Sequence, residues 1–394
     1  VFFFFPSNIY SQEISVPGII AESAIAIETT SGEILWEKNA EKRMYPASTT
    51  KMLTAIIAIE QVTDYNELVE ISENATGRNH SAFWFEEGDT ISLKDLLKAA
   101  LICSHNNATI ALAEHISGSE EKFVELMNKK AKKIGAESTY FQNTNGLDAN
   151  YPYHKTTAKD LTIIAKYCME NEMFRNIVNT KEDIIKINDK EVEIKSTNKL
   201  LPYYFVKGIK TGLTNNAGFC LVTYSDKNGI EIISVILNSD YMEREQDALN
   251  LINYISENYG YEKIVDEGEV AKEISVGEIN TVGIGLYTSA SYTDLINANK
   301  DKIVYEYEVN EGIDLPIPAG KELGKMGIYI NDSKVEEIPL ISGYSVNRPY
   351  MEQKITDKKE EKTEKILIFI LSFYFFLFAF IIVKNFFFRK RYYL

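Results

Sequence analysis

The sequence predicts an α+β protein: an antiparallel sheet covered by helices, with a helical subdomain, followed by a small all-β domain and a C-terminal transmembrane helix. Three observations support this prediction. β-rich segments flank a helical middle part, short strands with glycine turns follow residue 263, and residues 366–383 carry no charge. Helices that lie between strands of one sheet cover that sheet. At 394 residues, the chain is long enough for two domains.

The chain begins with an apolar run, VFFFFPSNIYSQE, that no basic segment precedes. This pattern is typical of the end of a signal peptide, with cleavage near Ser11. We therefore expect residues 1–19 to be a truncated signal-peptide remnant and N-terminal segment. The first folded domain is then expected to comprise residues 20–262.

Residues 24–29 and the segment ILWE predict two strands that form a hairpin around Gly32. The stretch YPASTTKMLTAIIAIE follows, and its apolar run predicts a buried helix that begins at Ser48 or Thr49. Residues three apart share a helix face, so the Lys51 amine can reach the Ser48 hydroxyl. Lysine is rarely buried unless it is paired or used. An N-cap serine followed by a surface lysine would give the same pattern.

The middle of the chain predicts three helices, at residues 92–102, 108–116 and 120–136. The last has Ser117-x-x-Glu120 as a capping box and Gly135 as a stop signal. Residues 217–224 and 230–237 are β-rich, and Asn228-Gly229 between them is a strong hairpin turn. A further helix is expected at 244–259. We expect the first and last strands of this domain to meet in one sheet.

Two short motifs add polar groups to this framework. Ser104-His105-Asn106 lies between two helical stretches, where a hydroxyl and a carboxamide can point into one cleft. Lys210-Thr211-Gly212 comes just before the hairpin; its cation and hydroxyl can hold an anion, and its glycine lets a ligand lie close to the strand. Each motif alone is equally consistent with an ordinary surface loop.

Composition and charge exclude some functions. The net charge of −15, with no basic cluster inside the folded part, argues against a nucleic-acid partner. Cys103, Cys168 and Cys220 form no close pair, so we expect buried thiols and at least one of them free. The four histidines show no metal-ligand spacing, and no metal site is expected.

The C-terminal part predicts a membrane anchor. Residues 263–345 form the small β domain, and residues 346–365 are predicted to be a charged, unpatterned stalk. The apolar residues 366–383 are about the minimum length for a membrane-spanning helix, and the basic tail 384–394 follows. The positive-inside rule places this tail in the cytoplasm, so the protein is expected in the cell membrane, single-pass, with its folded part extracytoplasmic.

Together the motifs are far more specific than any one of them. Ser-x-x-Lys at 48–51, Ser-x-Asn at 104–106 and Lys-Thr-Gly at 210–212 are the signature set of penicillin-binding proteins and serine β-lactamases. The chain resembles the low-molecular-weight penicillin-binding proteins that are D-alanyl-D-alanine carboxypeptidases, over residues 20–345. SAIAIETTSGEILWEKNAEKRMYPASTTKMLTA and VKGIKTGLTNNAGFCLV carry this resemblance beyond the motifs. Asn107 and His105 depart from the family's usual aspartate and its glycine or alanine.

The resemblance implies a serine β-lactamase-like fold and assigns roles to the motif residues. Ser48 would be the nucleophile and Lys51 its base, neutral because of burial and Lys210. Ser104 would relay the proton, and Asn106 would bind the substrate amide and orient Lys51. Around the substrate carboxylate, the resemblance implies Lys210, Thr211, Gly212 and Arg244. The oxyanion hole would consist of the backbone N–H groups of Ser48 and Leu213. Leu213 is expected to start the strand that follows Lys-Thr-Gly.

The implied substrates are peptidoglycan stem peptides ending in D-Ala-D-Ala, with β-lactam antibiotics as covalent inhibitors, membrane lipid as the partner of the C-terminal helix, and no metal or organic cofactor. Two alternatives stay open. A serine β-lactamase shares all three motifs, although the β domain, stalk and anchor argue against it. A non-hydrolytic penicillin-binding wall module is disfavoured because the catalytic residues are intact. His105 is also a candidate for an additional acid or base.

Overall fold

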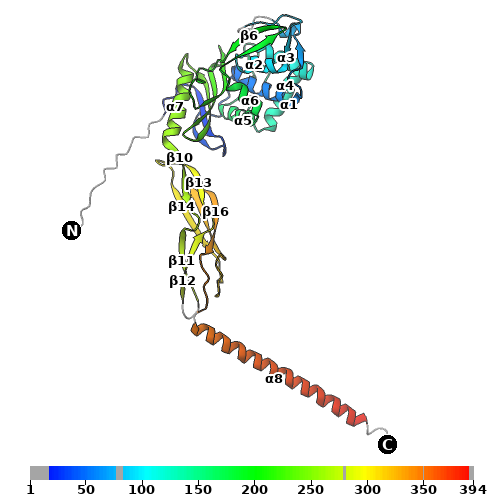
Figure 1. Ribbon diagram of the computed structural model, residues 1–394, viewed down its shortest axis with the longest axis vertical. Helices are drawn as coiled ribbons and strands as arrows, with labels where there is room; N and C mark the ends of the chain where they lie inside the picture. Colours follow the sequence, from blue (N-terminus) through cyan, green and yellow to red (C-terminus); the bar gives the residue numbers. More distant parts are fainter. Residues whose placement is uncertain (1–16, 77–82, 278–280, 349, 390–394) are drawn as a thin grey trace, which may run out of the picture. The chain divides into compact units, whose positions relative to one another are not determined.

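The computed structural model describes residues 17–76, 83–277, 281–348 and 350–389 (Figure 1). The chain divides into two compact units, the first reaching Gly260 and the second beginning at Tyr261. The apolar run around the predicted cleavage near Ser11, and the tail after Arg389, lie outside the described residues.

A five-stranded antiparallel sheet forms the centre of the first unit. Its strand order is β2-β1-β9-β8-β7. Because β1 pairs with β9, the first and last strands meet in one sheet, as predicted. Asn228 and Gly229 both have positive φ, which suits the predicted two-residue hairpin turn. The strands are β1 Ser23–Glu28, β2 Ile34–Lys38, β7 Val206–Thr214, β8 Gly218–Lys227 and β9 Ile230–Ser239.

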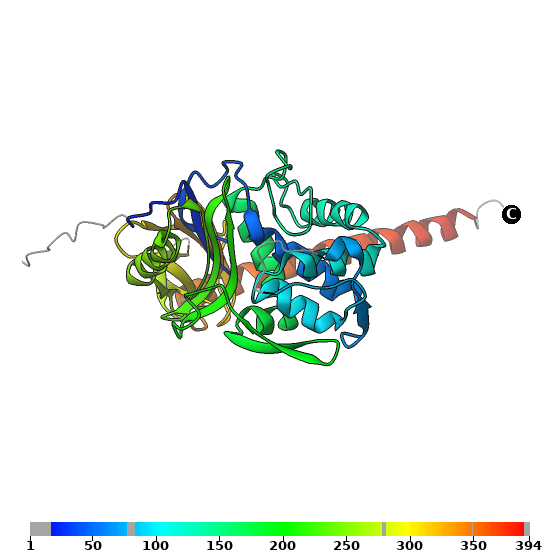
Figure 2. The ribbon, with the colours of Figure 1, turned by 90° about the horizontal axis from the view of Figure 1, so that it is seen from above.

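Helices cover both faces of this sheet (Figure 2). One face packs against α7, and α5 with the helical subdomain covers the other. The main apolar core lies between the sheet and this subdomain. The helices are α1 Lys51–Gln61, α2 Leu93–Leu101, α3 Asn106–Ser117, α4 Glu120–Lys133, α5 Ala158–Met169, α6 Glu172–Val178 and α7 Glu243–Asn258, with short 3₁₀ turns η1 Ala47–Thr50 and η2 Glu73–Ala75.

A second, smaller sheet was not predicted. It has the order β3-β4-β5-β6 and lies within the first unit. Two of its strands are only three residues long, too short for an alternating pattern to stand out in the sequence. The strands are β3 Leu68–Glu70, β4 Thr90–Ser92, β5 Glu182–Ile187 and β6 Lys190–Lys195.

Two local predictions are corrected by the structure. The predicted capping box is wrong: Ser117 ends α3, and the hydroxyl of Ser119 caps α4 by accepting from the Lys122 N–H at 3.3 Å. The reason is Gly118, whose left-handed backbone ends α3 and resets the chain for the next cap. The helix predicted from Ser48 begins as the η1 turn, and regular α-helix starts at Lys51.

The Lys-Thr-Gly motif lies inside strand β7 rather than before the strands, and Leu213 lies near the end of this strand rather than at its start. The strand was not predicted because two lysines and two glycines interrupt its β-branched residues and hide the pattern of a strand. Its position matters for the site, because β7 is an edge strand with one unpaired side.

The part of the second unit that precedes α8 is all-β, as predicted. A five-stranded antiparallel sheet has the order β11-β12-β16-β15-β14, and β10 pairs with β13. Ile284, Leu286, Ile328 and Leu340 are buried in its own apolar core. The strands are β10 Tyr259–Val265, β11 Val270–Val276, β12 Val282–Thr288, β13 Tyr292–Asn297, β14 Ile303–Val309, β15 Glu322–Ile330 and β16 Ser333–Ser342.

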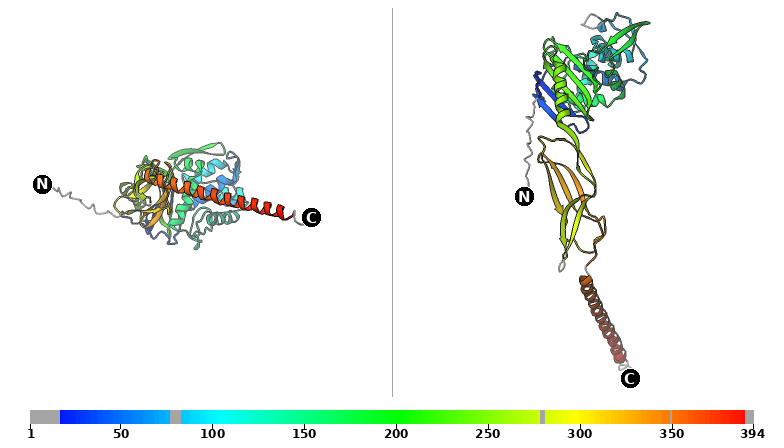
Figure 3. Two further views of the ribbon diagram at one scale, coloured as in Figure 1. Left: turned by 90° about the horizontal axis from the view of Figure 1, so that it is seen from below. Right: turned by 60° about the vertical axis from the view of Figure 1, so that its left-hand side comes forward.

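The C-terminal segment is one uninterrupted helix, α8 Tyr350–Arg389 (Figure 3). The unpatterned stalk predicted from residue 346 is therefore wrong for most of its length. Its glutamates and lysines favour helix, and Glu361 pairs with Lys365 one turn later at 2.6 Å. Within α8, Asp357–Ile382 is long and apolar enough to cross a membrane, and none of it is buried.

Candidate active site

Ser48 and Lys51 are held by a tight turn at the start of α1. Thr49 donates from both its N–H and its hydroxyl to the carbonyl of Pro46, at 3.3 and 2.7 Å, which fixes the η1 turn. Ser48 is partly exposed, whereas Lys51 is completely buried. The Lys51 Nζ lies 2.8 Å from the Ser48 Oγ, so the predicted pair is in contact.

Lys51 has three oxygen neighbours, and none of them is a carboxylate. Besides Ser48, its Nζ contacts the Asn106 Oδ1 and the Asn145 carbonyl, both at 2.7 Å. Burial holds the pKa of Lys51 well below its usual value, and the charge of Lys210 acts in the same direction. A neutral amine has two N–H groups and one lone pair. The two carbonyl oxygens can only accept, so the lone pair is left facing the Ser48 hydroxyl.

Asn145 was not identified from the sequence, because it acts through its backbone. Its loop is held by the Asn143 side chain, which accepts from the N–H groups of Asn145 and Gly146 at 3.2 and 2.7 Å. Gly146 has a φ of 89°, and a Cβ on it would lie 1.8 Å from the carbonyl oxygen of Ala47. Only glycine therefore lets this loop approach the η1 turn.

The same loop is tied to the end of β7. The Asp148 carboxylate accepts from the hydroxyl of Thr214 and from the side-chain amide of Asn216. The loop that carries the Asn145 carbonyl is therefore hydrogen-bonded to the end of the strand that carries the Lys-Thr-Gly motif.

The Ser-x-Asn motif forms the junction between α2 and α3. Ser104 has a left-handed backbone with a φ of 63° and is partly exposed, and Asn106 begins α3. Such a backbone is uncommon outside glycine and is concentrated at functional sites. The side-chain oxygen of Asn106 faces the Lys51 amine.

His105 is structural rather than an additional acid or base. It is completely buried between the rings of Phe83 and Phe85, with centroids at 4.4 and 4.6 Å. Its Nδ1 accepts from the Ala108 N–H and caps α3, while the Nε2 contacts the Phe83 carbonyl at 2.9 Å. Burial lowers the pKa of His105 to about 4, so the ring is neutral at pH 7.

Asn107, the other departure from the family pattern, also holds this junction. Its side-chain amide donates to the carbonyls of Ala75 and Thr76 at 3.0 and 2.5 Å. It therefore fastens the start of α3 to the η2 segment.

Lys210 is a second buried amine in the site. It is 1% exposed, and its Nζ donates to the Thr211 carbonyl at 3.1 Å. Burial lowers its pKa to about 7, Arg244 acts in the same direction, and Cys103 opposes the shift. Cys103 is itself buried, and burial raises the pKa of its thiol to about 11. The three cysteines are free and buried, as expected.

Gly212 lets another part of the protein, the η1 turn, lie close to strand β7. A Cβ on it would lie 3.0 Å from both the Ala47 Cβ and the Pro46 carbonyl oxygen. The η1 turn therefore packs directly on β7. Ala47 and Gly212 directly precede Ser48 and Leu213, the two residues whose N–H groups the resemblance assigns to the oxyanion hole.

Thr211 and Arg244 complete the predicted set. The Thr211 hydroxyl lies 2.5 Å from that of Thr197. Arg244, in the first turn of α7, donates to the Gly212 carbonyl at 3.1 Å and pairs with Glu245 at 2.9 Å. It thus adds positive charge directly beside the Lys-Thr-Gly strand.

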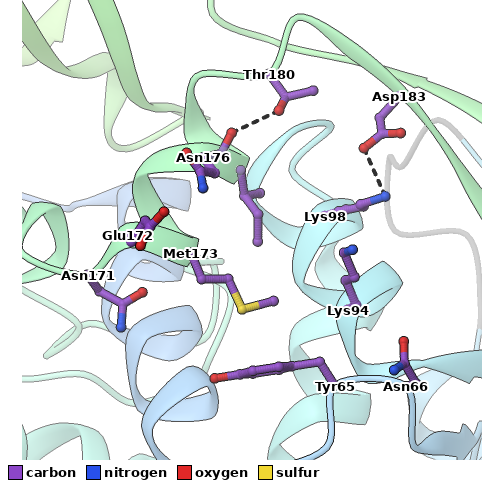
Figure 4. A pocket seen from close by; sticks show the side chains of 11 residues that line it. Tyr65, Asn66, Lys94, Lys98, Asn171, Glu172, Met173, Asn176, Thr180 and Asp183 are labelled. Atoms are coloured by element: carbon purple, nitrogen blue, oxygen red, sulfur yellow. Dashed lines mark hydrogen bonds and ion pairs between the residues drawn. The ribbon is translucent and has the colours of Figure 1, made fainter.

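A cavity of about 740 Å³ lies between α2 and α6, away from the motif residues (Figure 4). The ion pair of Lys98 and Asp183 lies at its rim, and Tyr65 and Met173 line it. It contains none of the motif residues. Within the described part of the chain, no group of three or more histidine, cysteine or acidic side chains could hold a metal ion.

Comparisons with known proteins show which family the chain is similar to. The sequence model of the peptidase family S11, D-alanyl-D-alanine carboxypeptidase, matches residues 10–241, and that of the penicillin-binding protein 5 C-terminal domain matches residues 259–348. The chain is 32% identical to D-alanyl-D-alanine carboxypeptidase DacF of Bacillus subtilis, covering 81% of this chain and 84% of that protein. It is 31% identical to the D-alanyl-D-alanine carboxypeptidase DacA of Haemophilus influenzae, over 82% and 84% of the two chains.

A solved structure gives the same result for the fold. The crystal structure of penicillin-binding protein 5 from Haemophilus influenzae superimposes with a TM-score of 0.63 and 27% identity. The match covers 85% of this chain and 99% of that one. The similarity therefore includes both units.

Proposed function

The chain belongs to the D-alanyl-D-alanine carboxypeptidase family, and on this premise we propose that Ser48 is the nucleophile that removes the terminal D-alanine of peptidoglycan stem peptides. The observation that carries the proposal is the contact of 2.8 Å between the Ser48 hydroxyl and the buried amine of Lys51. A serine hydroxyl becomes a good nucleophile only when a base takes its proton. Lys51, with its lowered pKa, is that base.

In the acylation step, the Ser48 Oγ attacks the carbonyl of the penultimate D-alanine while Lys51 takes the hydroxyl proton. The negative charge that develops on the carbonyl oxygen is stabilised by the backbone N–H groups of Ser48 and Leu213. Donors fixed in position before the reaction need no rearrangement as the charge forms. The close packing of Ala47 on Gly212, the residues that precede the two donors, supports this assignment.

The leaving D-alanine needs a proton on its nitrogen. In this proposal Ser104 relays the proton from Lys51. The Ser104 hydroxyl is partly exposed, and Asn106, two residues later in the same motif, contacts the Lys51 amine. Lys210 and Thr211 hold the free carboxylate of the terminal D-alanine, and this selects C-terminal substrates. Water then hydrolyses the acyl-enzyme, and β-lactams, which resemble the acyl donor, stall at this stage.

We further propose that α8 anchors the enzyme with a single membrane span. The apolar part of α8 has the length required, and Lys384, Arg389 and two further basic residues follow it. By the positive-inside rule, this end is cytoplasmic and the two folded units are extracytoplasmic. Protease added to intact cells should therefore digest both units, whereas a tag at the C-terminus should stay protected until the cells are opened.

The full-length protein in detergent tests the catalytic proposal. We would measure D-alanine release from diacetyl-L-Lys-D-Ala-D-Ala and labelling by a fluorescent penicillin, with Ser48→Ala beside the wild type. Ser333→Ala, an exposed position in the second unit, is the matched control. Loss of both signals in Ser48→Ala alone supports the proposal. Labelling without D-alanine release would instead favour a non-hydrolytic module, and rapid penicillin hydrolysis without D-alanine release would favour a β-lactamase.

A further inference from the structure

The Glu120 carboxylate reaches from α4 to the loop that carries the Asn145 carbonyl. Glu120 is the first residue of α4, and Thr144 directly precedes Asn145. One oxygen of this carboxylate, Oε1, accepts from the Thr144 N–H at 2.9 Å and from the Thr144 hydroxyl at 2.7 Å. The partners are 24 residues apart in the sequence, so this contact joins two separate parts of the fold and is not a local helix cap.

The Thr144 carbonyl is held by a different helix, α1. The Thr54 hydroxyl donates to it at 2.7 Å, and both threonines are completely buried. Thr54 lies three residues after Lys51, on the same face of that helix. Thr144 is therefore held both by α4 and by the helix that carries the base. The residue that follows it supplies the carbonyl that contacts the Lys51 amine.

Thr144 also touches the start of α3. Its hydroxyl lies 3.1 Å from the Thr109 hydroxyl, which donates to the Asn106 backbone carbonyl at 2.7 Å. Each hydroxyl has a single proton. Both protons have an acceptor that cannot donate, which is the Glu120 carboxylate for Thr144 and the backbone carbonyl for Thr109. A shift of Thr144 would therefore disturb the residues that supply both acceptors of the buried amine, Asn145 and Asn106.

Removing the Glu120 carboxylate would leave two buried donors of Thr144 without their acceptor. A buried N–H that loses its partner carries its full desolvation cost, so the backbone moves until it finds another acceptor. Such a movement of Thr144 passes directly to the Asn145 carbonyl, one residue later. The loop keeps its hydrogen bonds with Thr54 and Asn143, so the displacement is partial.

We propose that Glu120 is a positioning residue for the catalytic base. By holding Thr144, its carboxylate oxygen keeps the Asn145 carbonyl where it takes one N–H of the neutral Lys51 amine. This inference rests on the function of Lys51 proposed above. Glu120 is half-buried at the beginning of α4 and acts on the reaction through Thr144. Its effect belongs to the chemical step, whereas the Lys-Thr-Gly strand binds the substrate carboxylate.

The test follows acylation of the full-length protein in detergent by a fluorescent penicillin, over a range of penicillin concentrations. This separates the first-order acylation rate from the dissociation constant of the complex that forms first. A misplacement of about 1 Å costs about a hundredfold, so for the partial displacement in Glu120→Ala we expect a rate about tenfold lower, with an unchanged dissociation constant. Glu120→Gln keeps an oxygen that accepts both hydrogen bonds and should stay within about twofold of the wild type. Glu125→Ala, at an exposed carboxylate of the same helix, is the matched control and should acylate at the wild-type rate.

Thr144→Val is a second variant, which tests the same contact from the loop. It removes the hydroxyl and keeps the backbone N–H, so the rate should fall about threefold, because one of the two hydrogen bonds to Glu120 is lost. In the double variant with Glu120→Ala, the two losses should not multiply, because both substitutions remove one shared interaction. Losses that multiply would overturn the inference, and so would a wild-type rate in Thr144→Val.

Other outcomes also contradict the inference. A wild-type rate in Glu120→Ala would overturn it. A rate in Glu120→Gln as low as in Glu120→Ala would also overturn it, because the charge and not the hydrogen bonds would then matter. A smaller labelled fraction with an unchanged rate constant would show that Glu120 only stabilises the fold, which overturns it too.

Lys51→Ala is assayed beside these variants and should not acylate. If it acylates at the wild-type rate, the proposed role of the base fails, and the inference with it. Failure of the inference alone leaves Lys51→Ala inactive. Release of D-alanine by the wild type, measured on the same preparation, tests the carboxypeptidase function separately.

Discussion

The Lys51 amine and the backbone carbonyl of Asn145 lie 2.7 Å apart, and this contact decides which way the lone pair of Lys51 points. A buried lysine with the Ser48 hydroxyl as its single neighbour could rotate freely. Two fixed acceptors, the Asn145 carbonyl and the Asn106 side chain, take both N–H groups of the neutral amine. The base is therefore oriented before substrate arrives, which avoids rearrangement during the reaction.

Replacing Asn106 with aspartate should convert Lys51 from a base into a paired cation. A carboxylate at this distance raises the pKa of a lysine by about 1–3 units, and each unit lowers the neutral fraction tenfold. We expect Asn106→Asp to acylate with penicillin at least about tenfold more slowly at pH 7, with a rate that rises steeply with pH. Asn106→Ala is the control, since it removes the acceptor without adding charge. Identical pH profiles for the two variants would contradict this account.

Gly146→Ala should disable the site without touching a catalytic side chain. The new Cβ would lie 1.8 Å from the Ala47 carbonyl oxygen, so either the Asn145 loop or the η1 turn must move. A misplacement of about 1 Å can cost about a hundredfold in rate, and we expect that loss in penicillin acylation. Gly268→Ala is the matched control, because its φ is also positive but a Cβ there meets nothing within 4 Å. If both variants acylate at the wild-type rate, the loop does not position Lys51.

The charge of Lys210 should appear in the pH dependence of kcat/KM. Its pKa of about 7 in the free enzyme means that the cation is lost as the pH rises through 7, and with it the attraction for the substrate carboxylate. We expect kcat/KM to fall above pH 7, while kcat, which reports the substrate complex, stays level to higher pH. Lys210→Arg keeps its charge throughout, so its profile should lose this limb. A wild-type kcat/KM that stays constant to pH 9 would refute the assignment.

Sequence reasoning identified the site where spacing or side-chain chemistry carried the signal. Ser48 and Lys51 were paired by helix periodicity, and the structure places them in contact. Asn145 was missed because a backbone carbonyl leaves no residue-type signature. His105 was left open as an acid or base because a sequence does not show that two phenylalanine rings enclose it.

The predicted and the missed elements of the fold differ in the same way. The strands β1, β8 and β9 carry apolar runs between turn residues and were predicted. The strand β7 was missed because lysines and glycines interrupt its apolar pattern, although Lys210 in it is buried. The stalk was misjudged because composition alone suggested disorder, although its glutamate and lysine content also favours helix. Local propensity fails most often where function or tertiary packing selects the residue.

Two buried neutral histidines should make the first unit sensitive to acid. Burial lowers the pKa of His105 to about 4 and that of His154 to about 3, while unfolded histidine titrates near 6.5. Between the pKa of the folded state and 6.5, the unfolded chain binds more protons than the folded chain. The stability contribution of each histidine is therefore complete above pH 6.5 and is lost as the pH falls to about 4 for His105 and to about 3 for His154. Each histidine contributes a slope of about 1.4 kcal/mol per pH unit in this window.

Both tryptophans, Trp36 and Trp84, lie in the first unit, so urea unfolding followed by their fluorescence at pH 7, 6 and 5 reports on the stability of this unit. His154→Gln should be less stable than wild type at pH 7 but lose less stability between pH 6 and 5; an unchanged slope would mean that His154 does not titrate in this way.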